Sequence, residues 1–212
     1  MNVVKNNICT IIKIIIIINF NMNNIYAMNK IVTLSSANEV LSHINNLSAE
    51  PTVFIDVDDT IITPKSYSFR SPPYNKLIDK IKANHDKYDN YEEIISNWRL
   101  QRKIILIDEQ WSDVINKLKE KYKVFALTAM DMGPIGNIAS MEQWRYNELS
   151  SYGINFTQNI SFKNQDKANE CFYKGIFMTG TKSKSKTIEP FLSELSTKTL
   201  VMVDDRMSHI DD

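Results

Sequence analysis

The chain has 212 residues, of which 43% are hydrophobic and 24% are charged, and its formal net charge is zero. This length suffices for one domain with an insertion, and the composition is that of a globular protein. The balanced charge excludes a nucleic-acid partner, or a membrane surface, that is held by bulk electrostatic attraction.

The first element in chain order is a charged and apolar segment. Two lysines precede or flank a run of isoleucines at 14–18, and Ala27 supplies a small residue for cleavage. This pattern predicts a signal peptide over residues 1–27 and an exported protein, periplasmic or secreted. A bilayer span takes ~20 apolar residues, so no stable span is expected once the signal is removed. The segment could also remain as an uncleaved anchor, or translation from Met22 or Met28 could leave a cytoplasmic protein.

Strand and helix signals alternate along the rest of the chain. Apolar runs predict strands at 52–57, 123–127, 154–156, 175–178 and 200–203. Apolar residues at helical spacing predict helices around 36–47, 77–81, 91–98, 111–118, 141–149 and 188–195. Residues 63–73 read as a loop with three prolines, and a short apolar run follows at 104–107. The alternation favours an α/β fold, a Rossmann-like parallel sheet with helices on both faces.

Acidic residues directly follow two of the predicted strands. Asp56 and Asp58 come after the first of these strands, and Asp204 and Asp205 come after the last. Ligands of parallel sheets bind beyond the carboxyl ends of the strands, where Thr128 also ends a strand. Buried carboxylates need a counter-charge, and an all-oxygen ligand set suits Mg²⁺. The pattern predicts a magnesium site that handles phosphate, with a carboxylate as nucleophile.

A basic loop before the last strand adds candidates for phosphate binding. Lys182, Lys184 and Lys186 each offer an ammonium group that could hold phosphoryl oxygens together with Thr128. Response regulators also combine acids, a threonine and a lysine. Their lysine comes last and their phosphoacceptor aspartate stands alone in the middle, so this chain does not follow their order.

In this order, the acid cluster, threonine, lysine and acid pair resemble the haloacid dehalogenase (HAD) superfamily of phosphohydrolases, from about residue 52 to the C-terminus. The resemblance implies a Mg²⁺-dependent phosphatase for a small phosphorylated substrate, with Asp56 as nucleophile and metal ligand. Asp58 would be the general acid/base and would bind the metal through its main-chain carbonyl. Asp204 would be a further metal ligand, supported by Asp205.

The same resemblance divides the chain into a core and a cap. Residues 28–60 and 110–212 would form the core, and residues 61–109 would form a small, mainly helical cap inserted after the first motif. Caps of this kind exclude water and select the substrate. Arg70 in this segment could hold a second anionic group, although a solvated surface arginine is the simpler interpretation. Asp59 receives no role.

The stretch from Gly175 to Leu192 resembles a branch of exported HAD-like proteins of intracellular bacteria. In that branch the phosphate-binding lysine stands seven residues before a Phe-Leu pair, which implies Lys184. The branch has glycine at the next position, whereas this chain has Ser185, so Lys182 and Lys186 remain open.

The end of the chain motivates an alternative function. HAD folds continue with a further helix and strand after the last motif, whereas this chain has seven residues after Asp205. The sheet is therefore expected to lack an edge element, and the chain could be a fragment. Together with Ser185, this expectation supports a catalytically weak or inactive exported binding or interaction protein as the alternative.

Overall fold

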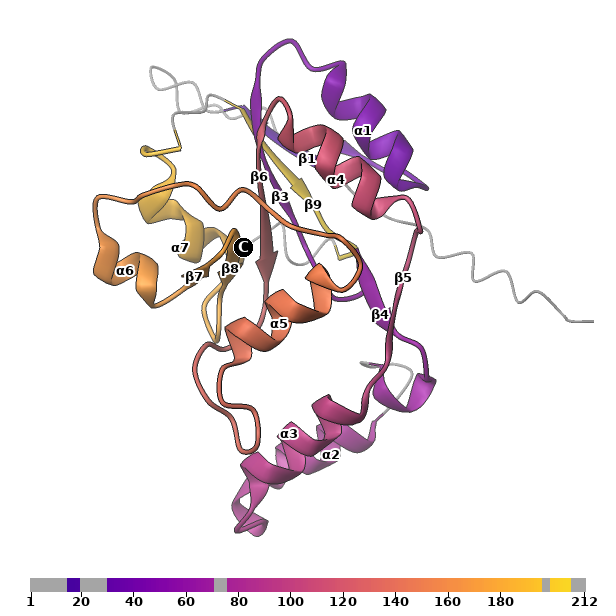
Figure 1. Cartoon of the computed structure of the whole chain (residues 1–212), viewed down its shortest axis with the longest axis vertical. Coiled ribbons are helices and arrows are strands. Elements are labelled where there is room, and N and C mark those ends of the chain that lie inside the picture. Colours follow the sequence, from indigo (N-terminus) through magenta and orange to yellow (C-terminus); the bar gives the residue numbers. More distant parts are fainter. Residues whose placement is uncertain (1–14, 20–29, 71–75, 196–198, 207–212) are drawn as a thin grey trace, which may run out of the picture.

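A mostly parallel seven-stranded sheet forms the centre of the protein, in the order β2-β1-β9-β3-β6-β8-β7 (Figure 1). The computed structural model describes residues 15–19 (backbone only), 30–70, 76–195 and 199–206. The strands are β1 (Ile15–Asn19), β2 (Lys30–Val32), β3 (Pro51–Ile55), β6 (Lys123–Thr128), β7 (Phe172–Tyr173), β8 (Ile176–Met178) and β9 (Thr199–Val203). Strands β9, β3, β6 and β8 are parallel, and the flanking strands join through antiparallel ladders.

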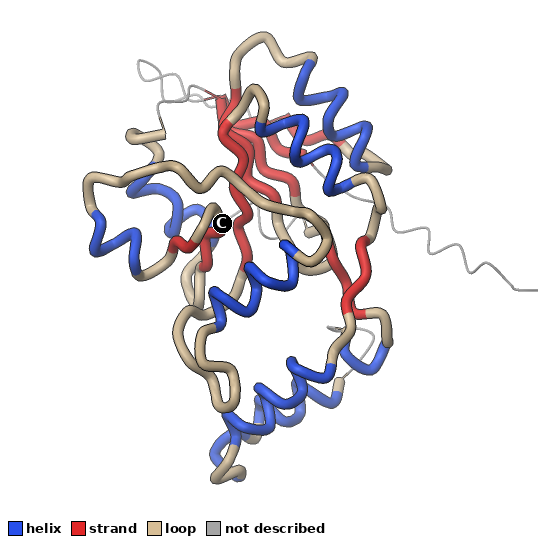
Figure 2. The backbone as a smooth tube through the Cα atoms, viewed as in Figure 1, coloured by secondary structure: helices blue, strands red, loops and turns tan. Residues whose placement is uncertain are grey.

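Helices cover both faces of this sheet, as the sequence predicts (Figure 2). The helices are α1 (Ala37–Asn45), α4 (Trp111–Lys119), α5 (Met141–Ser150), α6 (Gln165–Asn169) and α7 (Lys184–Ile188). Side chains alternate along β3, so Val53 and Ile55 pack with α1, α4 and α5. Phe54 faces the opposite way, into a second cluster that includes residues of α6 and α7. The α/β architecture is confirmed.

A separate lobe is inserted between β3 and β6 (Figure 1). It contains β4 (Ile62–Pro64), β5 (Ile104–Leu106), α2 (Leu77–Ala83), α3 (Tyr91–Gln101) and short 3₁₀ turns at Tyr67–Phe69 and His85–Lys87. Strands β4 and β5 pair antiparallel and form the stem of the lobe. The loop after β6 touches α3 closely, because a Cβ atom added to Gly136 would lie 2.4 Å from the carbonyl oxygen of Glu92.

Helix α1 illustrates how local sequence sets these boundaries. The Ser36 hydroxyl accepts a hydrogen bond from the Glu39 N–H at 3.3 Å, as expected of an N-cap. The Glu39 carboxylate does not return this bond to Ser36. It accepts from the Ser35 N–H at 2.7 Å and from the Ser35 hydroxyl, so the reciprocal bond reaches one residue further back.

Three sequence predictions about secondary structure are wrong. Residues 154–156 form no strand, because this segment meets β6 through isolated contacts such as the Thr157 N–H to the Val124 carbonyl. The helix predicted at 188–195 instead begins at Lys184, ends at Ile188 and continues as a 3₁₀ turn. Pro190 lacks the N–H that a longer α-helix requires. The predicted loop at 63–73 contains most of β4.

Strand β9 has neighbours on both sides. It pairs with β3 on one side and with β1 on the other, where Ile15 to Asn19 match Val203 to Thr199. Strand β9 is therefore an interior strand of the sheet. Strand β1 coincides with most of the isoleucine run of the predicted signal peptide, and the other residues before 28 lie outside the described ones. Within the described ranges, no helix has the length and apolar character to cross a bilayer.

Candidate functional site

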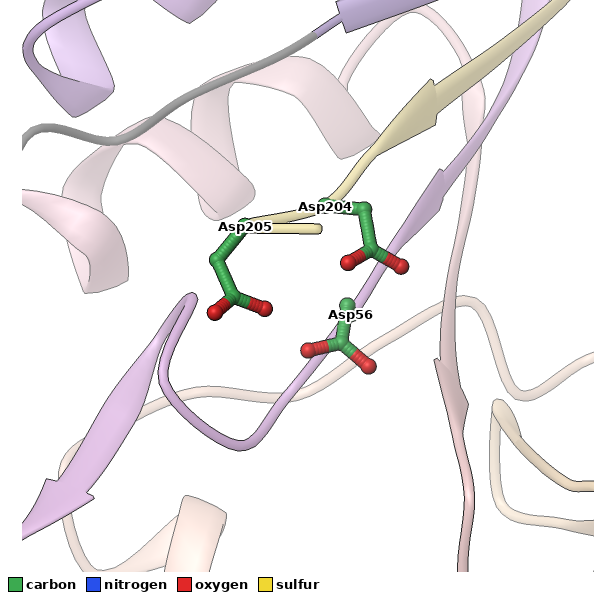
Figure 3. Close-up of side chains that lie close together, drawn as sticks. All are labelled: Asp56, Asp204 and Asp205. Carbon is green, nitrogen blue, oxygen red and sulfur yellow. The ribbon is translucent and has the colours of Figure 1, made fainter. Parts of the chain in front are cut away.

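Three carboxylates meet at the carboxyl ends of β3 and β9. Asp56 follows β3, while Asp204 and Asp205 follow β9, its parallel neighbour, in which Val203 lies opposite Ile55. Each of the three acids offers an oxygen within 4.8 Å of the others (Figure 3). Asp204 is fully buried and Asp56 is 5% exposed. The predicted meeting of acids from two strand ends is therefore present.

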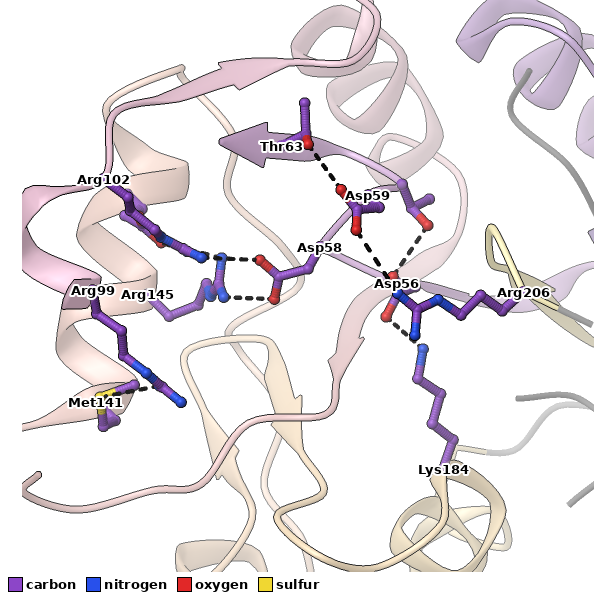
Figure 4. A network of polar contacts seen from close by, with 12 residues as sticks. Asp56, Asp58, Asp59, Thr63, Arg99, Arg102, Met141, Arg145, Lys184 and Arg206 are labelled. Atoms are coloured by element: carbon purple, nitrogen blue, oxygen red, sulfur yellow. Dashed lines mark hydrogen bonds and ion pairs between the residues drawn. The ribbon is translucent and has the colours of Figure 1, made fainter. Parts of the chain in front are cut away.

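One lysine lies among these acids. Lys184 is the first residue of α7, which the Ser183 hydroxyl caps, and its side chain is buried. Its ammonium donates to Asp56 Oδ1 and, at 2.6 Å, to Asp204 Oδ2 (Figure 4). Lys182 and Lys186 are exposed and line a separate pocket. Of the three candidate lysines, the fold places Lys184 in the acid cluster.

The turn after β3 is fixed by hydrogen bonds that sequence reasoning did not assign. The buried Thr60 hydroxyl donates to Asp56 Oδ2 at 3.1 Å and accepts from the Asp205 N–H at 3.1 Å. The Thr60 carbonyl accepts from the Trp111 indole N–H at 3.0 Å. Thr60 thus connects the two acidic strand ends, and α4 holds Thr60 in place.

The acid cluster carries more negative than positive charge. Burial, with a smaller contribution from the charge of Asp204, raises the pKa of Asp56 to about 7 against the lowering effect of Lys184. Burial also raises the pKa of Asp205 to about 6, although Arg206 opposes this shift. The Asp205 Oδ1 atom is buried and has no hydrogen-bond partner among the described residues. Three carboxylate donors with an unpartnered oxygen fit a small divalent cation such as Mg²⁺.

The carboxylate of Asp58 points away from this cluster (Figure 4). Its oxygens lie 2.7 Å from Arg145 Nη2 and 3.5 Å from Arg102 Nη1, and its side chain is 40% exposed. Desolvation raises the pKa of Asp58, but Arg145 and Arg102 outweigh it, so the pKa is lowered. The side chains that could hold the metal are therefore those of Asp56, Asp204 and Asp205. The expected contribution of Asp58, through its main-chain carbonyl, stays a prediction.

Sequence reasoning missed both arginines. Arg102 directly follows α3 of the lobe, and Arg145 lies on α5 of the core. Arg145 shares the buried face of α5 with Met141 and Leu149, four residues before and after it. A cation at a buried helical position indicates a buried partner, and this spacing was the available signal.

The remaining candidate residues are not among the three grouped acids. Thr128 ends β6 next to β3 and is buried, and its carbonyl accepts from the Thr179 N–H at 3.0 Å. Asp59 has φ of 64° and accepts the Thr63 hydroxyl at 2.8 Å, so it stabilises the turn. Arg70 is not solvated as expected, because it is buried and donates from Nε to the Pro64 carbonyl at 3.0 Å.

Comparison with known proteins identifies the family. Residues 33–212 match the model described as "Protein of unknown function (DUF2608)". The chain belongs to the DUF2608 family. A relative, "Uncharacterized protein RP296" of Rickettsia prowazekii (strain Madrid E), is 31% identical over 158 residues. The aligned part is 69% of this chain and 57% of that protein, so the chain spans little more than half of the relative. No solved structure matches the chain.

This match corrects the resemblance stated from the sequence. The family is DUF2608, and neither it nor the relative carries a HAD name, so membership of the HAD superfamily is wrong as an identification. Acids and a threonine at strand ends are brought together by any parallel sheet of this topology, and their order alone does not specify a superfamily. Roles for individual residues must therefore come from the geometry of this site.

Proposed function

We propose that this DUF2608 protein is a Mg²⁺-dependent phosphatase that hydrolyses a small phosphate ester through Asp56. The observation that supports this proposal is the convergence of Asp56, Asp204 and Asp205 with the Lys184 ammonium at one edge of the sheet. Buried carboxylates are costly to group together unless a cation compensates them. Phosphoryl transfer uses such a group, because it needs a held cation and a positioned nucleophile.

The chain's own residues divide the work in two steps. An Asp56 oxygen attacks phosphorus, the ester P–O bond breaks, and the substrate oxygen leaves with a proton as an alcohol. Water then attacks phosphorus, the bond to Asp56 breaks, and inorganic phosphate leaves with the Asp56 carboxylate restored. Lys184 and Thr128 hold the phosphoryl oxygens. Mg²⁺ on Asp56, Asp204 and Asp205 would neutralise phosphoryl charge during both steps.

Asp58 is the proposed proton donor and acceptor. Its pairs with Arg145 and Arg102 keep it ionised, which suits removal of a proton from the attacking water. To protonate the leaving oxygen, the Asp58 carboxyl must be released from these pairs and carry a proton, which it regains from the attacking water in the second step. An aryl phosphate needs no such protonation because its phenolate is a good leaving group. We therefore expect Asp58→Asn to impair turnover of alkyl phosphates more than that of aryl phosphates.

The direct test is hydrolysis of p-nitrophenyl phosphate by the purified chain, with Mg²⁺ and with EDTA. Asp56→Asn should lower kcat by about a thousandfold or more, as loss of a nucleophile does in other enzymes. Asp166→Asn, an exposed acid of α6, is the matched control and should leave kcat unchanged. Magnesium-dependent activity that persists undiminished in Asp56→Asn would exclude the proposed nucleophile.

The Lys184 ion pairs also favour a second candidate function. They neutralise part of the charge of Asp56 and Asp204 without a metal. A catalytically weak or inactive exported binding or interaction protein needs such compensation, because no metal would balance these buried acids. Thermal unfolding separates the two candidates, because a ligand that binds the native state raises its stability. The phosphatase should unfold at a higher temperature in millimolar Mg²⁺, and the second candidate should show no shift.

A further inference from the structure

A second charged cluster lies between the lobe and the core, on the side of Asp58 away from Asp56 (Figure 4). It contains three arginines, Arg99 and Arg102 from the lobe and Arg145 from α5. Two carboxylates accompany them. Asp58 pairs with Arg102 and Arg145, and Glu148 pairs with the same two arginines at 2.8 and 3.1 Å.

This cluster has one more cation than it has paired anions. The Arg99 side chain donates to Met141 Sδ at 3.6 Å, and within the described ranges no carboxylate lies at ion-pair distance from it. Burial and the charges of Arg102 and Arg145 lower the pKa of Arg99, although the charges of Asp58 and Asp131 oppose this shift. The cluster of Asp56, Asp204 and Asp205 instead has an excess of negative charge.

Arg145 supplies a second sign of an incomplete site. Its side chain is 3% exposed, and its buried Nε atom has no hydrogen-bond partner among the described residues. Its Nη1 atom lies 3.1 Å from Glu148 Oε2 without the alignment of a hydrogen bond. Buried donors without acceptors are costly, so such atoms indicate a missing partner with acceptor oxygens.

We propose that Arg99, Arg102 and Arg145 bind a second anionic group of the substrate, either a carboxylate or a second phosphate. Guanidinium groups fit both oxyanions with paired hydrogen bonds. Because Asp58 is two residues from Asp56, a small molecule can place its phosphoryl group at one cluster and its second oxyanion at the other. This inference rests on the proposed function and narrows its substrate class to phosphate esters with a second negative group.

The kinetic test compares substrates that differ in the second group. Wild type should hydrolyse 3-phosphoglycerate with a kcat/KM about tenfold or more above that for glycerol 1-phosphate. Fructose 1,6-bisphosphate against fructose 6-phosphate tests a second phosphate in the same way. Arg99→Gln should remove most of the preference and spare the singly anionic ester, because it leaves the pairs of Asp58 intact. Lys80→Gln, an exposed lobe cation, should keep the preference.

Direct binding separates this inference from the proposed function. Calorimetric titration with 3-phosphoglycerate and glycerol 1-phosphate requires no turnover. Tighter binding of 3-phosphoglycerate that Arg99→Gln abolishes and Lys80→Gln retains supports the anion site, even if no ester is hydrolysed. Hydrolysis with equal kcat/KM for both members of each pair would leave the phosphatase standing and overturn the anion site. Equal binding within this pair, and within the fructose 1,6-bisphosphate and fructose 6-phosphate pair titrated in the same way, would overturn it as well.

Discussion

Removal of the Lys184 ammonium is the sharpest test of the acid cluster. Lys184→Met keeps most of the side-chain volume but leaves Asp56 and Asp204, 5% and 0% exposed, without their shared cation. Breaking a buried ion pair by removing one partner typically costs about 3–5 kcal/mol. We expect the free energy of unfolding in EDTA to fall by about this amount. Lys186→Met, on the same helix but exposed, should change it by less than about 0.5 kcal/mol.

Urea unfolding measures both variants, and added Mg²⁺ supplies the second half of the experiment. If the three acids bind the metal, Mg²⁺ should stabilise Lys184→Met more than wild type, because the ammonium no longer competes for Asp56 and Asp204. At 100 times the dissociation constant the stabilisation is about 2.7 kcal/mol. A loss below about 1 kcal/mol in EDTA would refute the reasoning, because the carboxylates would then be stable without their cation.

Three further predictions concern the lobe, the helix caps and the first strand. Gly136→Ala should lower the free energy of unfolding by about 1–3 kcal/mol in a denaturant titration, because the residue has φ of 51° and its Cβ would overlap Glu92. Burial raises the pKa of the Glu142 carboxyl, but hydrogen bonds from its own N–H, the Gly133 N–H and Ser140 outweigh it, so the pKa is lowered. The stability that the Glu142 carboxylate contributes is complete above its pKa in the unfolded protein, and it is lost as the pH falls through its lower pKa in the folded protein. Glu142→Gln should therefore cost about 0.5 kcal/mol at pH 7 and nothing in strong acid, measured by unfolding at both pH values. Deletion of residues 1–27 should destabilise the sheet, because β9 loses the backbone hydrogen bonds of β1, each worth about 0.5–1.5 kcal/mol. If the shortened chain is as stable as the full one, the sheet does not need β1. That result would agree with cleavage of residues 1–27 as a signal peptide.

Local sequence predicted the elements whose burial pattern is strong. Helix α4 shows four buried apolar residues at helical spacing, and β3 and β9 are apolar throughout. The wrong predictions involve short or interrupted elements. Strand β4 has three residues and includes Pro64, and its pairing with β5 depends on a residue 40 positions away in Pro64↔Ile104. The periodicity of the sequence does not predict pairing between two strands so far apart in the chain.

The site residues also fall into those that the sequence predicts and those that it does not. Asp56, Thr128 and Asp204 were predictable because each stands at the carboxyl end of an apolar strand, and parallel strands bring their carboxyl ends to one edge. The resemblance implied Lys184 but left Lys182 and Lys186 open. The start of α7 separates the three lysines, and sequence periodicity placed that start four residues too late. The arginine cluster joins the lobe to α5 across a sequence distance that no local pattern spans.

The two acids around Val57 explain why one short segment serves two sites of opposite charge. The Asp56 N–H still donates to the Val203 carbonyl at 2.8 Å, so Asp56 continues the ladder to β9 and its carboxylate joins the acids there. Asp58 lies beyond the ladder, in a turn closed by the Ile61 N–H to the Val57 carbonyl, and its carboxylate faces the lobe. One cluster therefore lacks positive charge and the other lacks negative charge. A phosphate ester that arrives with a divalent cation at one end and a second oxyanion at the other satisfies both, which is why the substrate class and the metal should be tested together.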